Sequence, residues 1–315
     1  MITGQVLLTG GCGTLGTAIV KRATEEEWDC KITVFSRDAM KHLRLKNKYP
    51  HVQSIIGDIR DPMVLYNAMV GKDYVLHLAA VKHIPVSEYN SIDTFEINVT
   101  GSLNVCNAAL QLGTPHILGI TTDKSCHPAN AYGATKYLME KCFQEFARLE
   151  TKTQFHLVRY GNVIESNGSV VQEWKRAVEN GEPVKITDPA MTRFWLSPSQ
   201  AVDYVIASLE LESGHIYIPK TPALSIGKLL EYTIGDRHHE VERVDLRPGE
   251  KLHETLLTCE ETHYSQSHTL LGGDGYFILN PTTSERVESP WSGPYTSDTA
   301  RELTEDELKE LLADV

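Results

Sequence analysis

A short central segment of the chain brings together an acid, two amines and a phenol. Asp123 and Lys124 are adjacent, and Tyr132 and Lys136 follow, four positions apart. Residues at this spacing lie on one face of a helix, where the Lys136 ammonium can hold the Tyr132 phenol near ionisation. With Thr122 before them, these side chains offer a base for an oxidation, a second base and an acid. The set suits a sugar dehydratase better than a simple alcohol dehydrogenase.

Either pair could instead consist of ordinary surface residues. A Tyr and a Lys four positions apart often occur by chance, and Asp123 with Lys124 could form a solvated salt pair. Both pairs, however, follow a predicted buried strand at 116–121. The carboxyl ends of strands face the ligand in open α/β proteins. This position favours a catalytic role for both pairs.

The elements around this segment alternate between strands and helices. We expect strands at 5–9, 31–36, 52–56, 74–78, 116–121 and 155–159, and helices at 14–26, 63–69, 94–112 and 132–149, with a basic helix ending near 48. This alternation predicts an α/β fold, a Rossmann-type doubly wound parallel sheet. After about residue 161 the elements become shorter, with helices expected at 170–179, 199–211, 226–234 and 305–312. We therefore expect an NADP-binding Rossmann domain at 1–165. Residues 166–315 would form mainly a smaller C-terminal substrate-binding lobe, from which some segments return to the Rossmann domain.

A glycine-rich turn follows the first predicted strand and opens a helix. Gly10, Gly13 and Gly16 allow a tight turn, a close approach to a pyrophosphate and packing of the helix on the sheet, with Thr14 and Leu15 at the helix start. A plain turn is the alternative, but the strand before and the helix after favour a dinucleotide site.

The ends of the next strands indicate which dinucleotide binds. Ser36 and Arg37, with Lys41 one helical turn later, suit a 2′-phosphate, although Asp38 lies beside them. A site for NAD(H) would usually carry a carboxylate at the strand end. NADP(H) is therefore favoured, and NAD(H) stays possible. Further cofactor contacts are expected at the ends of the third and fourth strands, from Asp58, Ile59, Leu78, Ala79 and Ala80.

Composition narrows the choice of partners and compartment. The 315 residues carry a formal charge of −12, which disfavours nucleic acid and anionic membranes. The six cysteines form no metal-binding spacing, so we expect no metal site and a reduced, cytoplasmic protein. No apolar run is long enough to span a membrane.

Taken together, these residues resemble the extended short-chain dehydrogenase/reductase superfamily. Within it, the chain is similar to the soluble, inverting UDP-N-acetylglucosamine 4,6-dehydratases of bacterial polysaccharide and pseudaminic-acid pathways. The segments that carry the likeness are Ser36–Asp38, Ala79–His83, Thr122–Lys136, Arg159–Val163, Thr187–Trp195 and Arg247–Glu254.

The resemblance implies a role for each residue of the central segment. Tyr132 would take the proton of the sugar 4-hydroxyl while hydride leaves carbon 4 for the nicotinamide, and Lys136 would lower the pKa of the tyrosine. Lys124 would remove the carbon 5 proton, and Asp123 would protonate the departing 6-hydroxyl. Burial beside the cofactor and Lys136 is expected to keep Lys124 neutral part of the time. Reprotonation of carbon 5 from the opposite face would give the inverted product.

The resemblance also implies binding residues and a partner. Cofactor contacts would include Lys82, Asn98, Tyr132 and Lys136. A UDP-sugar, UDP-N-acetylglucosamine or a relative, would be held by Lys82, His83, Asn162, Arg193, Arg247 and Glu250, with Asn162 and the two arginines at the diphosphate. The protein would be a homo-oligomer.

Two other functions stay open. A UDP-hexosamine 4-epimerase would share the fold, the cofactor and the Tyr132–Lys136 pair, but it needs neither a base at carbon 5 nor an acid at carbon 6. Asp123 and Lys124 therefore count against an epimerase. A catalytically silent NADP-sensing or scaffold protein would not need this intact set at all.

Overall fold

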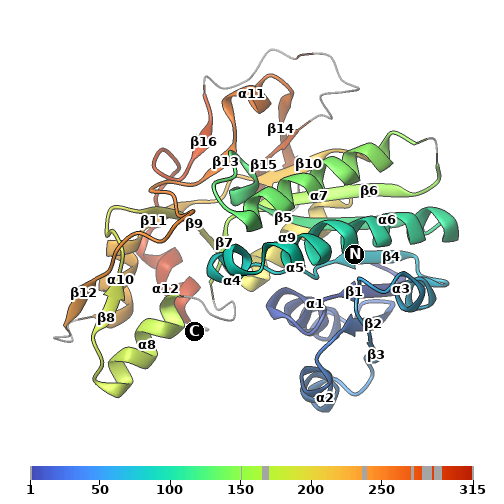
Figure 1. The fold of residues 1–315 in the computed structure, drawn as a ribbon, viewed down its shortest axis with the longest axis horizontal. Helices are drawn as coiled ribbons and strands as arrows, with labels where there is room; N and C mark the ends of the chain where they lie inside the picture. Colours follow the sequence, from blue (N-terminus) through green and yellow to red (C-terminus); the bar gives the residue numbers. More distant parts are fainter. Residues whose placement is uncertain are drawn as a thin grey trace.

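The architecture is a single large sheet covered by helices, with a second lobe at one end (Figure 1). The computed structural model describes residues 2–149, 151–164, 170–235, 240–270, 273–278, 286 and 293–313. All statements of structure below concern these residues.

Seven parallel strands form the centre of the sheet, in the order β3-β2-β1-β4-β5-β6-β10. Antiparallel β15 and then β14 extend it beyond β10. The bounds are β1 Gly4–Thr9, β2 Cys30–Ser36, β3 Gln53–Ile56, β4 Tyr74–His77, β5 His116–Thr122, β6 Gln154–Tyr160, β10 Ile216–Pro219, β14 Ser265–Leu270 and β15 Gly273–Ile278. The expected Rossmann-type doubly wound sheet is confirmed.

Helices cover both faces of the sheet because its strands carry apolar side chains on both sides. On one face, Leu65 and Phe143 belong to a buried cluster that joins α3 and α7 to the strands. On the other, Ile19 and Val205 join α1 and α9 to them. The bounds are α1 Thr14–Glu25, α2 Ala39–Lys48, α3 Pro62–Met69, α6 Gly101–Leu112, α7 Ala131–Ala147 and α9 Pro198–Ser208.

The strand order reverses at β1, which lies between β2 and β4. The connections after β1 and after β4 therefore leave the sheet in opposite directions and open a crevice at the carboxyl ends of these strands. A 3-10 turn, η2 (Asp123–Ser125), follows β5 at the same edge. The central segment of the sequence thus lies where ligands of such sheets bind.

The second lobe consists of short elements with a core of their own. Its bounds are α8 Val170–Asn180, β8 Val184–Ile186, β9 Thr192–Leu196, β11 Ala223–Ser225, α10 Ile226–Ile234, β12 Val241–Arg243 and α12 Glu305–Ala313. Trp174, Leu229 and Leu308 are buried together in this core. β7 (Asn162–Val163) pairs with β9, and β13 (Thr255–Leu257) pairs with β16 (Tyr295–Thr296) near the short helix α11 (Cys259–Thr262).

The chain crosses between the two parts several times. The expected boundary between 165 and 166 falls in 165–169, outside the described residues. Beyond it, α9 packs against α1, and β10, β14 and β15 belong to the central sheet.

The helical region between β4 and β5 differs from the sequence-based expectation. Two short helices, α4 (Ile84–Tyr89) and α5 (Ser91–Phe95), precede the π-helical turn η1 (Glu96–Thr100) and α6. The expected helix at 94–112 therefore begins earlier, and α4 was not expected. Pro85 lies in the first turn of α4, a position that proline favours, and the non-helical backbone of Asn90 separates α4 from α5.

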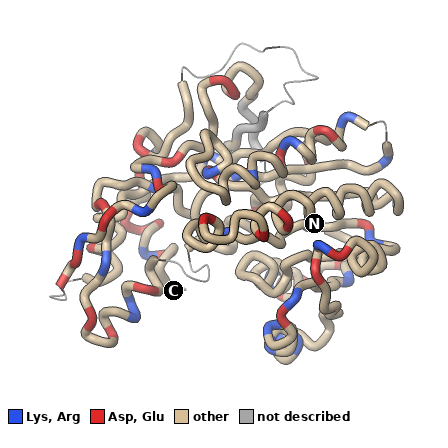
Figure 2. The backbone as a smooth tube through the Cα atoms, viewed as in Figure 1, with Lys and Arg blue, Asp and Glu red and all other residues tan. Residues whose placement is uncertain are grey.

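Acidic and basic residues are scattered along the trace and interspersed with each other in both parts of the molecule (Figure 2). No described helix combines the length and the apolar character needed to cross a membrane. The described residues also contain no cluster of three or more His, Cys, Asp or Glu side chains that could hold a metal ion.

Candidate active site

Two adjoining cavities lie at the carboxyl edge of the sheet. The larger, about 780 Å³, extends from the glycine-rich turn past η2 and the start of α7 to β9 and the second lobe. The smaller, about 220 Å³, lies at the ends of β2 and β3. Both are lined by Gly10, Gly13, Lys41, Ala79 and Ala80, so together they form one elongated site.

The glycine-rich turn opens the N-terminus of α1 toward this site. Gly10 has φ +67°, and a Cβ there would lie 2.7 Å from the backbone nitrogen of Ala79, so only glycine fits. Gly13 caps α1 without any side-chain hydrogen bond. The first N–H groups of α1 therefore stay available at the cavity wall, beside Thr14, Leu15 and Gly16. This is a suitable cradle for a pyrophosphate.

The smaller cavity is lined by the residues predicted to choose between NAD(H) and NADP(H). Ser36, Arg37 and Lys41 lie on its wall, and Arg37 is exposed. The Asp38 carboxylate instead accepts hydrogen bonds from the backbone nitrogens of Met40 and Lys41, both 3.0 Å away, as the N-cap of α2. Its role in the helix cap explains why an acid stands here.

Asp58 and Ile59 also line the smaller cavity. The Asp58 carboxylate lies 2.7 Å from the Arg60 guanidinium and 3.7 Å from that of Arg37. Asp58 thus contacts two cations, of which Arg37 also lines the smaller cavity.

The end of β4 forms the opposite wall. Leu78, Ala79 and Ala80 line the larger cavity, as do Lys82 and His83. Asn98 does not reach it: this side chain is fully buried in η1 and exchanges hydrogen bonds with the backbone of Val81, 2.8 and 2.9 Å away. Asn98 therefore supports the loop after β4 from behind.

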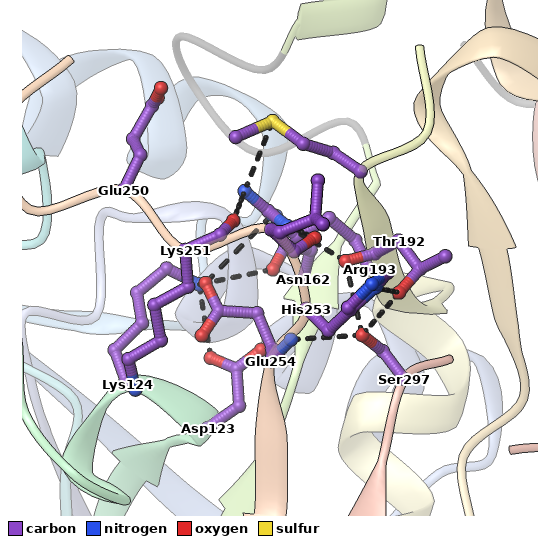
Figure 3. Close-up of polar contacts among 12 residues, drawn as sticks. Asp123, Lys124, Asn162, Thr192, Arg193, Glu250, Lys251, His253, Glu254 and Ser297 are labelled. Atoms are coloured by element: carbon purple, nitrogen blue, oxygen red, sulfur yellow. Dashed lines mark hydrogen bonds and ion pairs between the residues drawn. The ribbon is translucent and has the colours of Figure 1, made fainter. Parts of the chain in front are cut away.

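The turn η2 places the predicted acid and base. Thr122 ends β5 and donates to Asp123 Oδ1 at 2.9 Å. Asp123 is completely buried, whereas Lys124 and Thr122 line the cavity. Lys124 Nζ lies 3.0 Å from Asp123 Oδ1, 3.3 Å from Asn162 Oδ1 and 3.4 Å from Glu254 Oε1 (Figure 3). Asp123 is thus connected to the cavity through Thr122 and Lys124.

The electrostatics of this group differ from the expectation for Lys124. Burial lowers the pKa of Lys124, but the Asp123 and Glu254 carboxylates outweigh burial and raise that pKa above its ordinary value. Burial raises the pKa of Asp123, and the charge of Glu254 adds to this against the opposing charge of Lys124. Burial beside the cofactor and Lys136 was expected to keep Lys124 neutral part of the time, whereas the two carboxylates around the ammonium favour its charged form. The proton held by Lys124 has a nearby acceptor in Asp123.

The Tyr132–Lys136 pair lies at the start of α7. The Asn130 side chain caps this helix by accepting from the Gly133 nitrogen at 2.8 Å. Lys136 Nζ donates to the Ile120 carbonyl at 2.7 Å, and burial lowers the pKa of Lys136 to about 8.

Both residues line the larger cavity, as predicted from their spacing. Burial raises the pKa of Tyr132, and this is opposed by the charge of Lys124 and a hydrogen bond with Thr122. Lys124 is therefore a cation that favours the ionised phenol, and the effect expected of Lys136 stays a prediction.

A buried ion-pair network contacts the turn η2 and stabilises its position. The Arg159 guanidinium of β6 lies 2.7 Å from the Glu140 carboxylate of α7 and 2.9 Å from that of Glu261. Glu140 also accepts from the hydroxyls of Ser125 and Thr121, at 2.7 and 2.5 Å. This network fixes the turn that carries Asp123 and Lys124. The network joins residues that lie far apart in the sequence, so no local sequence pattern predicted it.

The predicted diphosphate residues occupy different environments. Arg193 is buried at the cavity wall, and its guanidinium donates to the carbonyls of Thr192, Lys251 and Leu252 at 2.7 to 3.2 Å. Arg247 also lines the cavity but is exposed. Among the described residues, no hydrogen bond or ion pair engages the Arg247 guanidinium.

Glu250 and Asn162 complete the predicted set. Glu250 lines the cavity and accepts from the backbone nitrogen of Arg247 at 3.3 Å, so it stabilises the turn that presents this arginine. In Figure 3, Glu250 lies apart from Lys124, whereas Asn162 points to it. The sequence reasoning missed Glu254, whose only signal was its place at the end of the Arg247–Glu254 segment.

Known proteins resemble this chain over most of its length. A family model described as a polysaccharide biosynthesis protein matches residues 6–271. A UDP-N-acetylglucosamine 4,6-dehydratase (inverting) of Campylobacter jejuni is 35% identical over 284 residues, 88% of this chain and 83% of the relative. A UDP-glucose 4-epimerase of Rickettsia massiliae is 33% identical and covers 98% of this chain and 94% of its own length. The crystal structure of Pen from Bacillus thuringiensis superimposes with a TM-score of 0.90 at 29% identity, covering 99% of this chain and 97% of Pen.

Proposed function

Because the chain belongs to the polysaccharide biosynthesis protein family, we propose that it is a UDP-N-acetylglucosamine 4,6-dehydratase of the inverting type. The proposed product is a UDP-4-keto-6-deoxy-hexosamine with inverted carbon 5. The observation that carries this proposal is the Asp123–Lys124 pair: an acid and a base 3.0 Å apart, of which Lys124, like Tyr132, lines the cavity of about 780 Å³ and Asp123 lies buried behind it.

A nicotinamide dinucleotide fits the cradle at the start of α1, and when bound it supplies the acceptor and donor of the hydride that moves from carbon 4 to carbon 6. Gly10, Gly13 and the first N–H groups of α1 would hold its pyrophosphate. Ser36, Arg37 and Lys41 favour NADP(H), because the one acid among them, Asp38, already caps α2.

The protein residues move the protons. Tyr132 takes the proton of the sugar 4-hydroxyl, aided by the positive charge of Lys124. The elimination then needs a neutral Lys124 to accept the carbon 5 proton and a protonated Asp123 to supply the proton that leaves with the 6-hydroxyl as water. Transfer of one proton from Lys124 Nζ to Asp123 Oδ1 creates both forms at once. The elimination returns the pair to its starting state, because Lys124 now holds the carbon 5 proton and Asp123 is again a carboxylate. The proton that carbon 5 takes up on the opposite face would come from the Tyr132 phenol, which gained one proton in the first step and is thereby returned to its ionised form.

The uridine diphosphate would lie toward the second lobe. Arg247 is the better candidate for the diphosphate, since its guanidinium is exposed at the cavity whereas that of Arg193 is bonded to three carbonyls. Arg193 would then fix the shape of the site beside the sugar.

A UDP-hexosamine 4-epimerase is the second candidate, because relatives named UDP-glucose 4-epimerase match nearly the whole chain. Purified protein incubated with UDP-N-acetylglucosamine distinguishes the two by mass and proton NMR. A product that has lost one water supports the dehydratase. A product of unchanged mass with an inverted 4-hydroxyl refutes it in favour of the epimerase.

A further inference from the structure

Glu254 is a buried carboxylate at the wall of the larger cavity that the proposed proton transfers do not use. It is 2% exposed and directly precedes β13. Its backbone is held on both sides: its nitrogen donates to Ser297 Oγ, and its carbonyl accepts from the Ser297 nitrogen, both at 2.9 Å. Ser297 in turn contacts Thr192, beside Arg193 (Figure 3). The position of Glu254 is therefore fixed through its backbone.

The side-chain carboxylate of Glu254 takes no part in these backbone hydrogen bonds and instead contacts charged residues of the site. Oε1 lies 3.4 Å from Lys124 Nζ and 3.8 Å from Arg193 Nε. Oε2 is buried without a hydrogen-bond partner among the described residues. A carboxylate that stabilised only the fold would be expected to satisfy both oxygens. Its nearest charge is instead the predicted base.

Neutralising Arg193 would be a simpler role for Glu254. Arg193 is the more distant of the two cations, however, and its guanidinium already binds the carbonyls of Thr192, Lys251 and Leu252. The charge at Lys124 is the better explanation for a buried carboxylate here.

We propose that Glu254 is a positioning residue that retains the proton shared by Asp123 and Lys124 inside the site. This inference rests on the proposed dehydratase function. A negative charge beside the pair disfavours loss of its one proton to solvent, so Lys124 becomes a base only when Asp123 becomes an acid. Without Glu254, the pair would lose this proton at lower pH. Lys124 could then still remove the carbon 5 proton, but Asp123 would have none to give to the 6-hydroxyl.

Other charged groups that face this pair must be considered. Tyr132 of α7, Arg193 of β9 and Lys251 lie near Lys124 or Glu254 and stay in place in a Glu254 variant. Lys136, with a pKa of about 8, will affect the rate of any oxidation-dependent step. The ratio of dehydration to deuterium exchange at carbon 5 cancels this effect, because both reactions require the preceding oxidation.

The test follows this ratio for Glu254→Gln in deuterated buffer from about pH 7 to about pH 10. The wild-type ratio should stay flat to a higher pH than the variant ratio. The midpoint of the fall in the variant ratio should lie about one to two pH units below the wild-type midpoint, as expected for removal of a charge within about 4 Å. Deuterium exchange at carbon 5 should continue in the variant while dehydration falls. Glu254→Asp keeps the charge and should follow the wild type to within about half a pH unit. Glu260→Gln, an exposed carboxylate on α11, is the matched control and should not move the profile.

A Glu254→Gln ratio with the wild-type midpoint would overturn the inference, and so would a Glu254→Asp midpoint shifted as far as that of the Gln variant. If Glu254→Gln does not fold, the inference is still tested by the wild-type profile and by Glu254→Asp, whose midpoint should lie within about half a pH unit of the wild-type midpoint. Dehydration and exchange that decline together in the wild type at high pH would contradict a shared proton. Absence of water loss from the wild type would refute the proposed function itself, which is a separate outcome.

Discussion

Replacing Lys124 by Ala should weaken both catalysis and folding, for one electrostatic reason. The change removes the cation that lies 3.0 Å from Asp123 and 3.4 Å from Glu254, two carboxylates that are at most 3% exposed. Removing one partner of a buried ion pair costs about 3–5 kcal/mol, because the remaining charge is left uncompensated. We therefore expect the free energy of unfolding to fall by about 3 kcal/mol or more near pH 8.

The pH dependence of this loss checks its cause. Without Lys124, the folded-state pKa values of Asp123 and Glu254 rise above their unfolded values of about 4. The folded variant then binds more protons than its unfolded chain, so its stability decreases as pH rises through this window. The deficit against the wild type should thus be smaller near pH 5 than near pH 8. Urea unfolding at both values measures it.

A matched double variant separates charge from packing. Lys124→Met with Asp123→Asn keeps side-chain volume and removes one charge of each sign. We expect it to recover at least half of the lost stability while dehydration and carbon 5 exchange stay absent. If the free energy of unfolding of Lys124→Ala at pH 8 equals that of the wild type, the stabilising ion pair of Lys124 is refuted. Carbon 5 exchange at the wild-type rate in that variant would refute Lys124 as the base.

Three further predictions concern the ligands and the first proton transfer. Arg37→Ala should weaken NADP(H) binding by about 10-fold or more and change the affinity for NAD(H) by no more than about threefold, because only NADP(H) carries a 2′-phosphate. Equal losses of affinity in titrations with both cofactors would exclude a contact between Arg37 and the 2′-phosphate. Arg247→Ala should weaken UDP binding by about 10-fold or more with cofactor affinity unchanged, and calorimetry should find a smaller effect on UDP for Arg193→Ala, whose main cost is stability. An equal or larger effect for Arg193 would reverse this assignment. Tyr132→Phe should lower the reduction of bound cofactor by the sugar by about 100-fold or more, and single-turnover absorbance that matches the wild type would contradict its role as the base.

Local sequence patterns predicted the parts of the site that are built within one turn or one helix. The glycine turn, the Tyr132–Lys136 pair and the strand-end position of Asp123 and Lys124 all depend on spacing over a few residues, and all line or adjoin one cavity. The parallel sheet followed from the alternation of elements, since each crossover helix returns the chain to the same direction.

Features that depend on distant contacts could not be read from the sequence. Glu254 reaches Lys124 from a segment 130 residues later, and its backbone is held by Ser297 from still further along the chain. The pKa of Lys124 was incompletely predicted for this reason: local reasoning identified burial and Lys136, which lower it, but not the Glu254 carboxylate, which raises it. The antiparallel strands β14 and β15 pair with each other locally, but they join the sheet through the long-range pairing of β15 with β10, which no local pattern predicts.

The central claim, that this chain oxidises carbon 4 and reduces carbon 6 of one sugar, is tested most directly by the fate of the hydrogen on carbon 4. UDP-N-acetylglucosamine carrying deuterium at carbon 4 should be converted to a product that has lost one water. NMR should then find the deuterium in the new carbon 6 methyl group. Deuterium that returns to carbon 4 of a sugar of unchanged composition, with the 4-hydroxyl inverted, would contradict the dehydratase account.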